Sequence, residues 1–116
     1  MENTIETITK MIEILAKQNA TPEEKLVQSL IKAALLSDSL GRFMNEVNAA
    51  VNGFGKVHTQ TVKDTVEFFK ANNEAMIRKT DYSDEQKEVM VKQEIDRLTE
   101  VCVWILGTLA LWGVLV

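Results

Sequence analysis

Residues 101–116 read Val-Cys-Val-Trp-Ile-Leu-Gly-Thr-Leu-Ala-Leu-Trp-Gly-Val-Leu-Val, and they contain no charged side chain. Thirteen of these 16 residues are apolar, and the other three are two glycines and one threonine. All 30 charged residues of the 116-residue chain lie between Glu2 and Glu100. A helix that is apolar on every side has to be buried, either in protein or in lipid. This segment therefore decides the architecture.

The length of this apolar segment is marginal for crossing a membrane. A bilayer core is ~30 Å thick and needs about 17–20 helical residues, whereas a helix of 16 residues spans only ~24 Å. Because a bilayer can thin around a short helix, the sequence predicts a candidate membrane segment at 101–116 and a charged helical body at 1–100. The N-terminus starts acidic, and its apolar residues occur at intervals instead of as the continuous apolar run of a signal peptide. We therefore expect that body to be cytoplasmic. The alternative is that 101–116 is a core helix and the whole protein is cytoplasmic.

The body of the chain has the pattern of helices, because its apolar residues recur at spacings of three and four and show no strand alternation. A first helix is predicted over about 4–19, with the apolar stripe Ile5, Ile8, Ile12 and Leu15. A second begins at the capping box Thr21-Pro22-Glu23-Glu24. It is predicted to run for about 30 residues, until Gly53 and Gly55 form a hinge.

Two further helices complete the predicted fold. The third covers about 56–79, and the fourth begins at a second capping box, Ser83-Asp84-Glu85-Gln86. The polar face disappears after Glu100 without an evident stop signal, so one helix of about 33 residues is predicted to reach 116. Short connections favour antiparallel neighbours. The predicted fold class is all-α: a four-helix antiparallel bundle with a long last helix that becomes fully apolar.

The residues that carry most catalytic chemistry are scarce. The chain has one cysteine and one histidine, His58, and nothing in the sequence places the two together for nucleophilic catalysis. It contains neither a Glu-x-x-His pair, which helical metal sites use, nor a phosphate-binding glycine loop. With a pI near 5.0 and a net charge of −4, nucleic-acid binding is not expected. We therefore expect no enzyme, no cofactor and no metal.

The apolar segment also suggests self-association. Small residues recur at Gly107, Ala110 and Gly113, and such residues let two helices approach closely in lipid. Trp104 and Trp112 fit either a membrane interface or a contact between helices. The predicted membrane or oligomer contact residues are Val101, Trp104, Ile105, Gly107, Leu109, Ala110, Leu111, Trp112 and Gly113.

Two functional hypotheses follow from these observations. The first is a non-enzymatic, membrane-associated helical protein that is anchored by its C-terminal helix, with lipid and a second copy of itself as partners. Such a protein would be a membrane-perturbing effector, a holin-like or immunity-type protein, or a recruiter of partners to the membrane. The second is a soluble four-helix interaction module, acting as adaptor, chaperone or regulator. It would use residues 101–116 as core or oligomer interface. The sequence identifies no particular protein partner.

Overall fold

The computed structural model describes residues 19–116, which form four helices. These are α2 (Pro22–Leu36), α3 (Leu40–Val51), α4 (Thr59–Arg78) and α5 (Asp84–Leu111). The helix predicted over 4–19 lies, apart from its last residue, outside the described residues. Within the described part of the chain the prediction of an all-α fold with four helices is confirmed.

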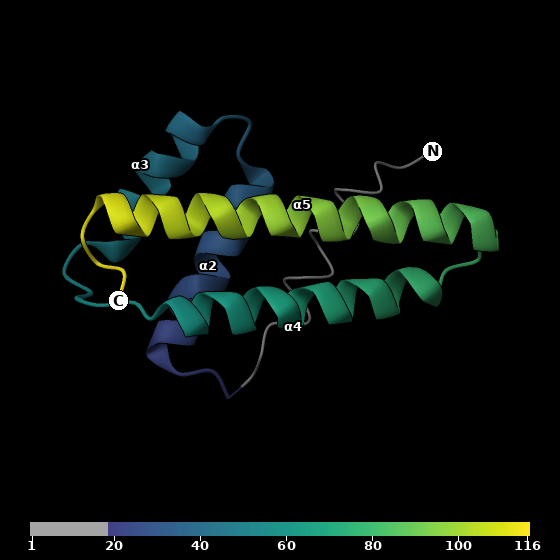
Figure 1. Cartoon of the computed structure of the whole chain (residues 1–116), viewed down its shortest axis with the longest axis horizontal. Coiled ribbons are helices and arrows are strands. Elements are labelled where there is room, and N and C mark those ends of the chain that lie inside the picture. The colour runs from purple at the N-terminus through teal and green to yellow at the C-terminus, as the bar shows by residue number, and fades with distance from the viewer. Residues whose placement is uncertain (1–18) are drawn as a thin grey trace.

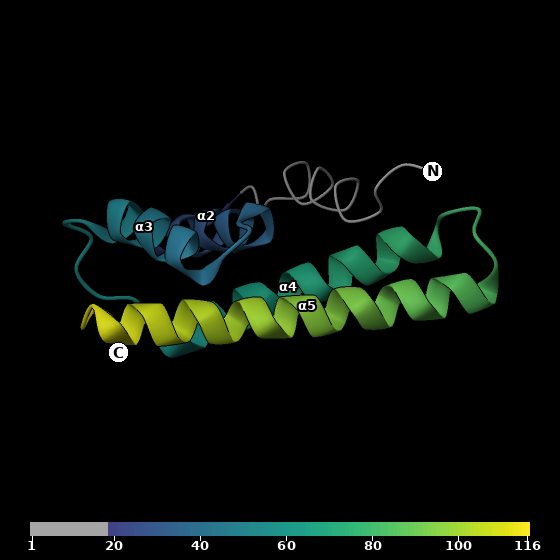
Figure 2. The ribbon, with the colours of Figure 1, turned by 90° about the horizontal axis from the view of Figure 1, so that it is seen from above.

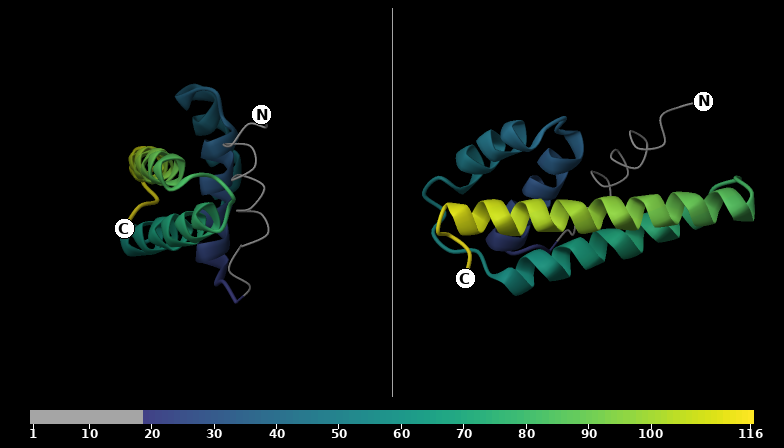
Figure 3. Two further views of the ribbon diagram at one scale, coloured as in Figure 1. Left: turned by 90° about the vertical axis from the view of Figure 1, so that its right-hand side faces the viewer. Right: turned by 45° about the horizontal axis from the view of Figure 1, so that its top comes forward.

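The helices are arranged as a long hairpin with a second layer at one end. Helices α4 and α5 lie side by side and run in opposite directions (Figure 1). Helix α2 crosses one face of this hairpin and α3 turns back beside α5, as the view from above shows (Figure 2). Viewed end-on, α2 stands beside both hairpin helices (Figure 3). The connected ends of α4 and α5 project beyond the α2–α3 layer.

The core lies where the two layers meet. All four helices contribute side chains that are almost fully removed from water, including Ile31, Phe43, Phe69 and Leu98, each at most 1% exposed. A second, smaller apolar cluster occupies the projecting part of the hairpin, where Ile77 and Val91 are buried and Met90 and Ile95 pack against them. The fold therefore has a main core under α2 and α3 and a thin apolar seam beyond it.

The prediction of a single helix from Pro22 to the glycines at 53 and 55 is wrong. The helix breaks at residues 37–39, where the side chains of two serines form hydrogen bonds with backbone groups at the end of α2 and at the start of α3. The Ser37 hydroxyl donates to the Ala33 carbonyl at the end of α2, and the Ser39 side chain accepts from the Arg42 amide at the start of α3. Serine competes with helix continuation in this way. The break lets α3 fold back and place Phe43 in the core.

The prediction that the last helix continues to 116 is also wrong, since α5 ends at Leu111. Gly113 has φ +71°, and around it the Gly113 amide donates to the Ala110 carbonyl and the Val114 amide to the Leu109 carbonyl. These two hydrogen bonds are the Schellman arrangement, in which a left-handed glycine ends a helix. The remaining residues leave the helix axis and turn back toward the start of α4.

Residues 114–116 pair with residues 57–59. The Val57 amide donates to the Val114 carbonyl and the Val116 amide donates to the Val57 carbonyl, over 2.7 and 2.8 Å. The Val116 oxygen then accepts from both the amide and the hydroxyl of Thr59, at 2.9 and 3.0 Å. This short parallel pairing fixes the C-terminal segment against the loop between α3 and α4, and Val57 is fully buried beneath it.

Candidate functional site: the outer face of α5

Helix α5 divides the residues of the apolar segment between core and surface. Val101, Ile105 and Leu109 are at most 4% exposed and pack in the main core. Trp104 is half-buried, and its ring centroid lies 5.8 Å from that of Phe43. The division proposed at 100/101 falls inside α5, which continues through it as one helix. Four of the predicted contact residues thus contact other parts of the same chain.

The other predicted contact residues lie at the surface. Leu111 is 69% exposed and Trp112 is 36% exposed, and Gly107, Ala110 and Gly113 are also exposed. Val103, which is not among the predicted contact residues, is 64% exposed on the same helix. The spacing of four between residues 103, 107 and 111 places them on one helix face. We call Val103, Gly107 and Leu111 the outer stripe.

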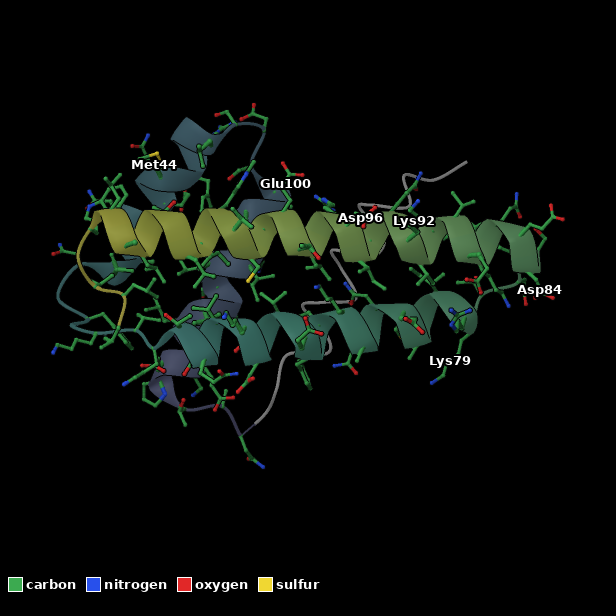
Figure 4. The ribbon with its side chains drawn as sticks, viewed as in Figure 1. Met44, Lys79, Asp84, Lys92, Asp96 and Glu100 are labelled. Atoms are coloured by element: carbon green, nitrogen blue, oxygen red, sulfur yellow. The ribbon has the colours of Figure 1, made fainter. Side chains whose placement is uncertain are left out.

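The outer stripe continues a row of charged residues along α5. Lys92, Asp96 and Glu100 follow one another at the same spacing of four and are exposed, as their labelled side chains show (Figure 4). Three residues after Glu100 comes Val103, where the exposed face changes from charged to apolar. The surface of α5 therefore has a charged half toward the projecting end of the hairpin and an apolar half toward Trp112.

The two glycines of the apolar segment have different explanations. Gly113 has the left-handed conformation that ends α5, so it has a role within its own chain. Gly107 is inside the helix, where glycine is less favourable than alanine by about 1 kcal/mol. A Cβ built at Gly107 would meet no atom within 4 Å. Nothing in the described fold therefore requires a glycine at this exposed position.

Gly53 and Gly55, predicted as a hinge, lie in the connection between α3 and α4. Both have positive φ, +77° and +98°, a backbone conformation that other residues adopt only with strain. The glycines thus serve a turn that brings the chain from the end of α3 to Val57.

The single histidine takes part in a contact between two helices. His58 is the N-cap residue of α4, and its Nδ1 lies 2.8 Å from Oε1 of Glu23 on α2. A carboxylate can only accept, so the Nδ1 donates. Glu23 also accepts from the His58 amide and from the Thr61 hydroxyl. The carboxylate therefore caps α4 from a neighbouring helix, at the end where the helix dipole favours a negative charge.

These hydrogen bonds act on the protonation of Glu23. Burial alone raises the pKa of Glu23, but the hydrogen bonds from Thr61 and His58 outweigh burial and lower the pKa below its ordinary value of 4.5. This contact does not show in the sequence, because Glu23 and His58 are separated by 35 positions. No local spacing signals a pairing over such a distance.

Replacing Glu23 by glutamine is expected to lower the free energy of unfolding by about 1 kcal/mol at neutral pH, since the charge-assisted hydrogen bonds are weakened. A lowered native pKa gives stability that is present above 4.5 and is lost as the pH falls through the native pKa. The difference between Glu23→Gln and the parent should therefore shrink in acid. Urea unfolding across this pH range measures it. Glu46→Gln, at an exposed position on α3, is the control, and an equal effect there would contradict the capping role.

Glu23 also lines a groove of about 570 Å³ between α2 and α4. Its three carboxylates, on Glu23, Glu24 and Asp64, all accept hydrogen bonds within the chain.

Among residues 19–116, no three His, Cys, Asp or Glu side chains gather closely enough to hold a metal ion. In the same range, no helix combines the length and apolar character needed to cross a membrane, so the transmembrane segment predicted at 101–116 is not supported.

Comparison with known proteins adds no relative. The chain matches no family model, no curated protein and no solved structure.

Proposed function

We propose that this chain is a non-enzymatic helical interaction module that pairs with a second copy of itself through the outer stripe of α5. The observation that carries the proposal is the exposure of Val103 and Leu111, 64% and 69%, on either side of Gly107. Two large apolar side chains flank a position where the backbone is bare and unobstructed. Such a surface permits a second helix to approach closely, with its own apolar side chains beside the glycine.

The charges on α5 favour an antiparallel pairing of the two copies. If two α5 helices crossed with Gly107 against Gly107, an antiparallel arrangement would place Val103 of one copy against Leu111 of the other. The carboxylates of Asp96 and Glu100 would then lie beyond the contact. A parallel arrangement would place each of these carboxylates opposite its own counterpart, where like charges repel. The interface is therefore self-complementary about a twofold axis.

A lipid surface is the other candidate for covering the outer stripe, because the uncharged residues 101–116 also predict a lipid partner. For an anchor to form from the whole of residues 101–116, Val101, Ile105 and Leu109 would have to leave the main core. Residues 114–116 would also have to give up their hydrogen bonds to residues 57–59. These costs favour a partner that uses only the exposed residues, and a second copy of the chain does so.

Single cysteines test the pairing in a background that carries Cys102→Ala, because Cys102 is the only native thiol. Under mild oxidation Gly107→Cys is expected to form a cross-linked dimer, because the two sulfurs would meet at the twofold axis within disulfide reach. Glu100→Cys, two turns away on the same face, is the matched control and is expected to stay monomeric. Cross-linking of both variants would indicate the parallel arrangement and contradict the antiparallel one.

Analytical ultracentrifugation of Val103→Glu and Leu111→Glu completes the test. Both positions are exposed, so we expect native helicity together with loss of the dimer. The parent chain is also sedimented with vesicles of mixed phosphatidylcholine and phosphatidylglycerol. A parent that is monomeric at every concentration would overturn the proposal. If that monomer also binds vesicles and Leu111→Glu does not, the outer stripe contacts lipid instead.

A further inference from the structure

Two polar side chains are buried in the hairpin just beyond the main core, and a third, partly buried one lies beside them. Asn73 on α4 is 1% exposed and Glu94 on α5 is 5% exposed, and Arg97 follows one turn later on α5. Within the described residues, four buried atoms of these side chains have no hydrogen-bond partner: both amide atoms of Asn73, Oε1 of Glu94 and Nη1 of Arg97. Buried polar atoms in native proteins are nearly always paired. Unpaired atoms in three neighbouring side chains therefore need an explanation.

The register of the hairpin brings Asn73 and Glu94 to the same level. Arg78 on α4 contacts Glu88 on α5 through Nη1 and Oε1 at 2.7 Å. In an antiparallel pair, five residues back from Arg78 is Asn73, and five residues forward from Glu88 is position 93, next to Glu94. Both side chains are buried, so both point into the seam between the helices. Arg97 donates through Nη2 to the Leu35 carbonyl at the end of α2, which places the cluster at the border of the α2–α3 layer.

The hydrogen-bonding capacity of Glu94 depends on its charge. An ionised carboxylate only accepts, whereas a protonated one also donates an O–H. The unpartnered carbonyl oxygen of Asn73 is the acceptor that such a donor needs. Protonation therefore removes a buried charge and adds an O–H to the two unpartnered donors of this cluster, Nδ2 of Asn73 and Nη1 of Arg97.

The groups around Glu94 leave it poorly compensated when it is ionised. Burial raises the pKa of Glu94 and the charge of Arg97 lowers it, with burial the larger effect. Asn73 on α4 is neutral, and two charged residues that flank it on that helix form ion pairs, Lys70 with Glu67 and Glu74 with Arg78. On α2, the Leu35 carbonyl accepts from Arg97.

We propose that Asn73, Glu94 and Arg97 form a proton-controlled latch, which holds the projecting end of the α4–α5 hairpin closed when Glu94 is protonated and loosens it when Glu94 is ionised. The latch lies between the main core and the small cluster of Ile77, Val91, Met90 and Ile95. Opening would expose that small cluster while leaving the main core intact. This inference uses residues remote from the outer stripe, so it stands independently of the proposed self-association.

The direction of the effect follows from linkage. The native pKa of Glu94 is raised above its ordinary value of 4.5, so the closed form binds the proton more tightly than the open form does. Closure is therefore most favoured below 4.5 and weakens as the pH rises through the native pKa. Above that pKa the open form of the projecting end is relatively more populated.

Hydrogen exchange of the full chain measures this local opening. Protection factors, corrected for the intrinsic effect of pH, are compared at about pH 5 and about pH 7.5 for segments 72–80 and 86–97, with 26–35 as internal reference. We expect the projecting segments to lose about three- to tenfold protection at the higher pH while the reference stays constant. In Glu94→Gln, which is neutral at every pH, this difference should disappear.

Asp96→Asn is the matched control, because it removes an exposed carboxylate from the same helix. It is expected to keep the pH dependence of the parent. Glu94→Met is a second neutral variant in case the glutamine side chain perturbs folding, and its circular dichroism is checked first. Equal protection of the parent at both pH values would overturn the proposal. A pH dependence that persists in both neutral variants would overturn it as well.

Discussion

A chain that ends at Glu100 is expected to lose its cooperative fold. The deletion removes Val101, Ile105 and Leu109, which are buried in the main core, together with the pairing of residues 114–116. Burying one such apolar side chain contributes about 1.5–3 kcal/mol, and a whole domain has a net stability of only about 5–15 kcal/mol. The loss of three core side chains therefore approaches the entire stability of the protein.

Thermal unfolding followed by circular dichroism at 222 nm measures this effect. A chain that ends at Leu111 is the matched control, because it keeps the three core residues. It loses the turn around Gly113, the partly buried Val114 and Leu115, and the pairing with residues 57–59. We expect it to fold with a lowered midpoint. A sharp unfolding transition in the chain ending at Glu100 would contradict the assignment of residues 101–109 to the core. It would favour instead a separate body at 1–100.

Phe43→Ala is expected to lower the free energy of unfolding by about 3–5 kcal/mol, the usual cost of deleting a buried phenylalanine. Phe43 is fully buried and is the aromatic side chain through which α3 reaches Trp104 on α5. Its removal leaves a cavity between these two helices. Chemical denaturation measures the loss, and the fluorescence of Trp104 is expected to shift to longer wavelength as its surroundings become more polar.

Leu40→Ala on the same helix provides the comparison. Leu40 is 46% exposed, and surface substitutions usually change stability by less than about 0.5 kcal/mol. Similar losses in the two variants would mean that α3 is not held to α5 by its aromatic contact. The break at residues 37–39 would then have no packing consequence.

The helix starts could be predicted because their signals are local. The capping boxes at Thr21 and Ser83 are both formed, with reciprocal hydrogen bonds to Glu24 and Gln86. The break after Leu36 was missed because the apolar spacing continues through it, and three polar residues in a row did not outweigh that periodicity. The end of α5 had a recognisable signal in Gly113, but the glycine was attributed to helix packing instead of to termination.

The candidate site was predicted only in part, for a physical reason. Periodicity assigns helix faces by contrast between polar and apolar residues, and residues 101–116 offer almost no such contrast. Core residues such as Ile105 and surface residues such as Leu111 therefore had the same appearance in sequence. Glu94 lies at helical spacing between Val91 and Leu98, both buried, and this spacing indicates the core face. A carboxylate is nevertheless usually exposed, so its residue type indicates the opposite.

The pairing of Thr59 with Val116 has a consequence for the order of folding. These residues are separated by 57 positions, and contacts over long separations form late because they close large loops. During synthesis the first turn of α4 emerges long before the segment that pairs with it. We therefore expect that the nascent chain does not reach its native fold until α5 has been synthesised, and that it then folds as one unit instead of helix by helix.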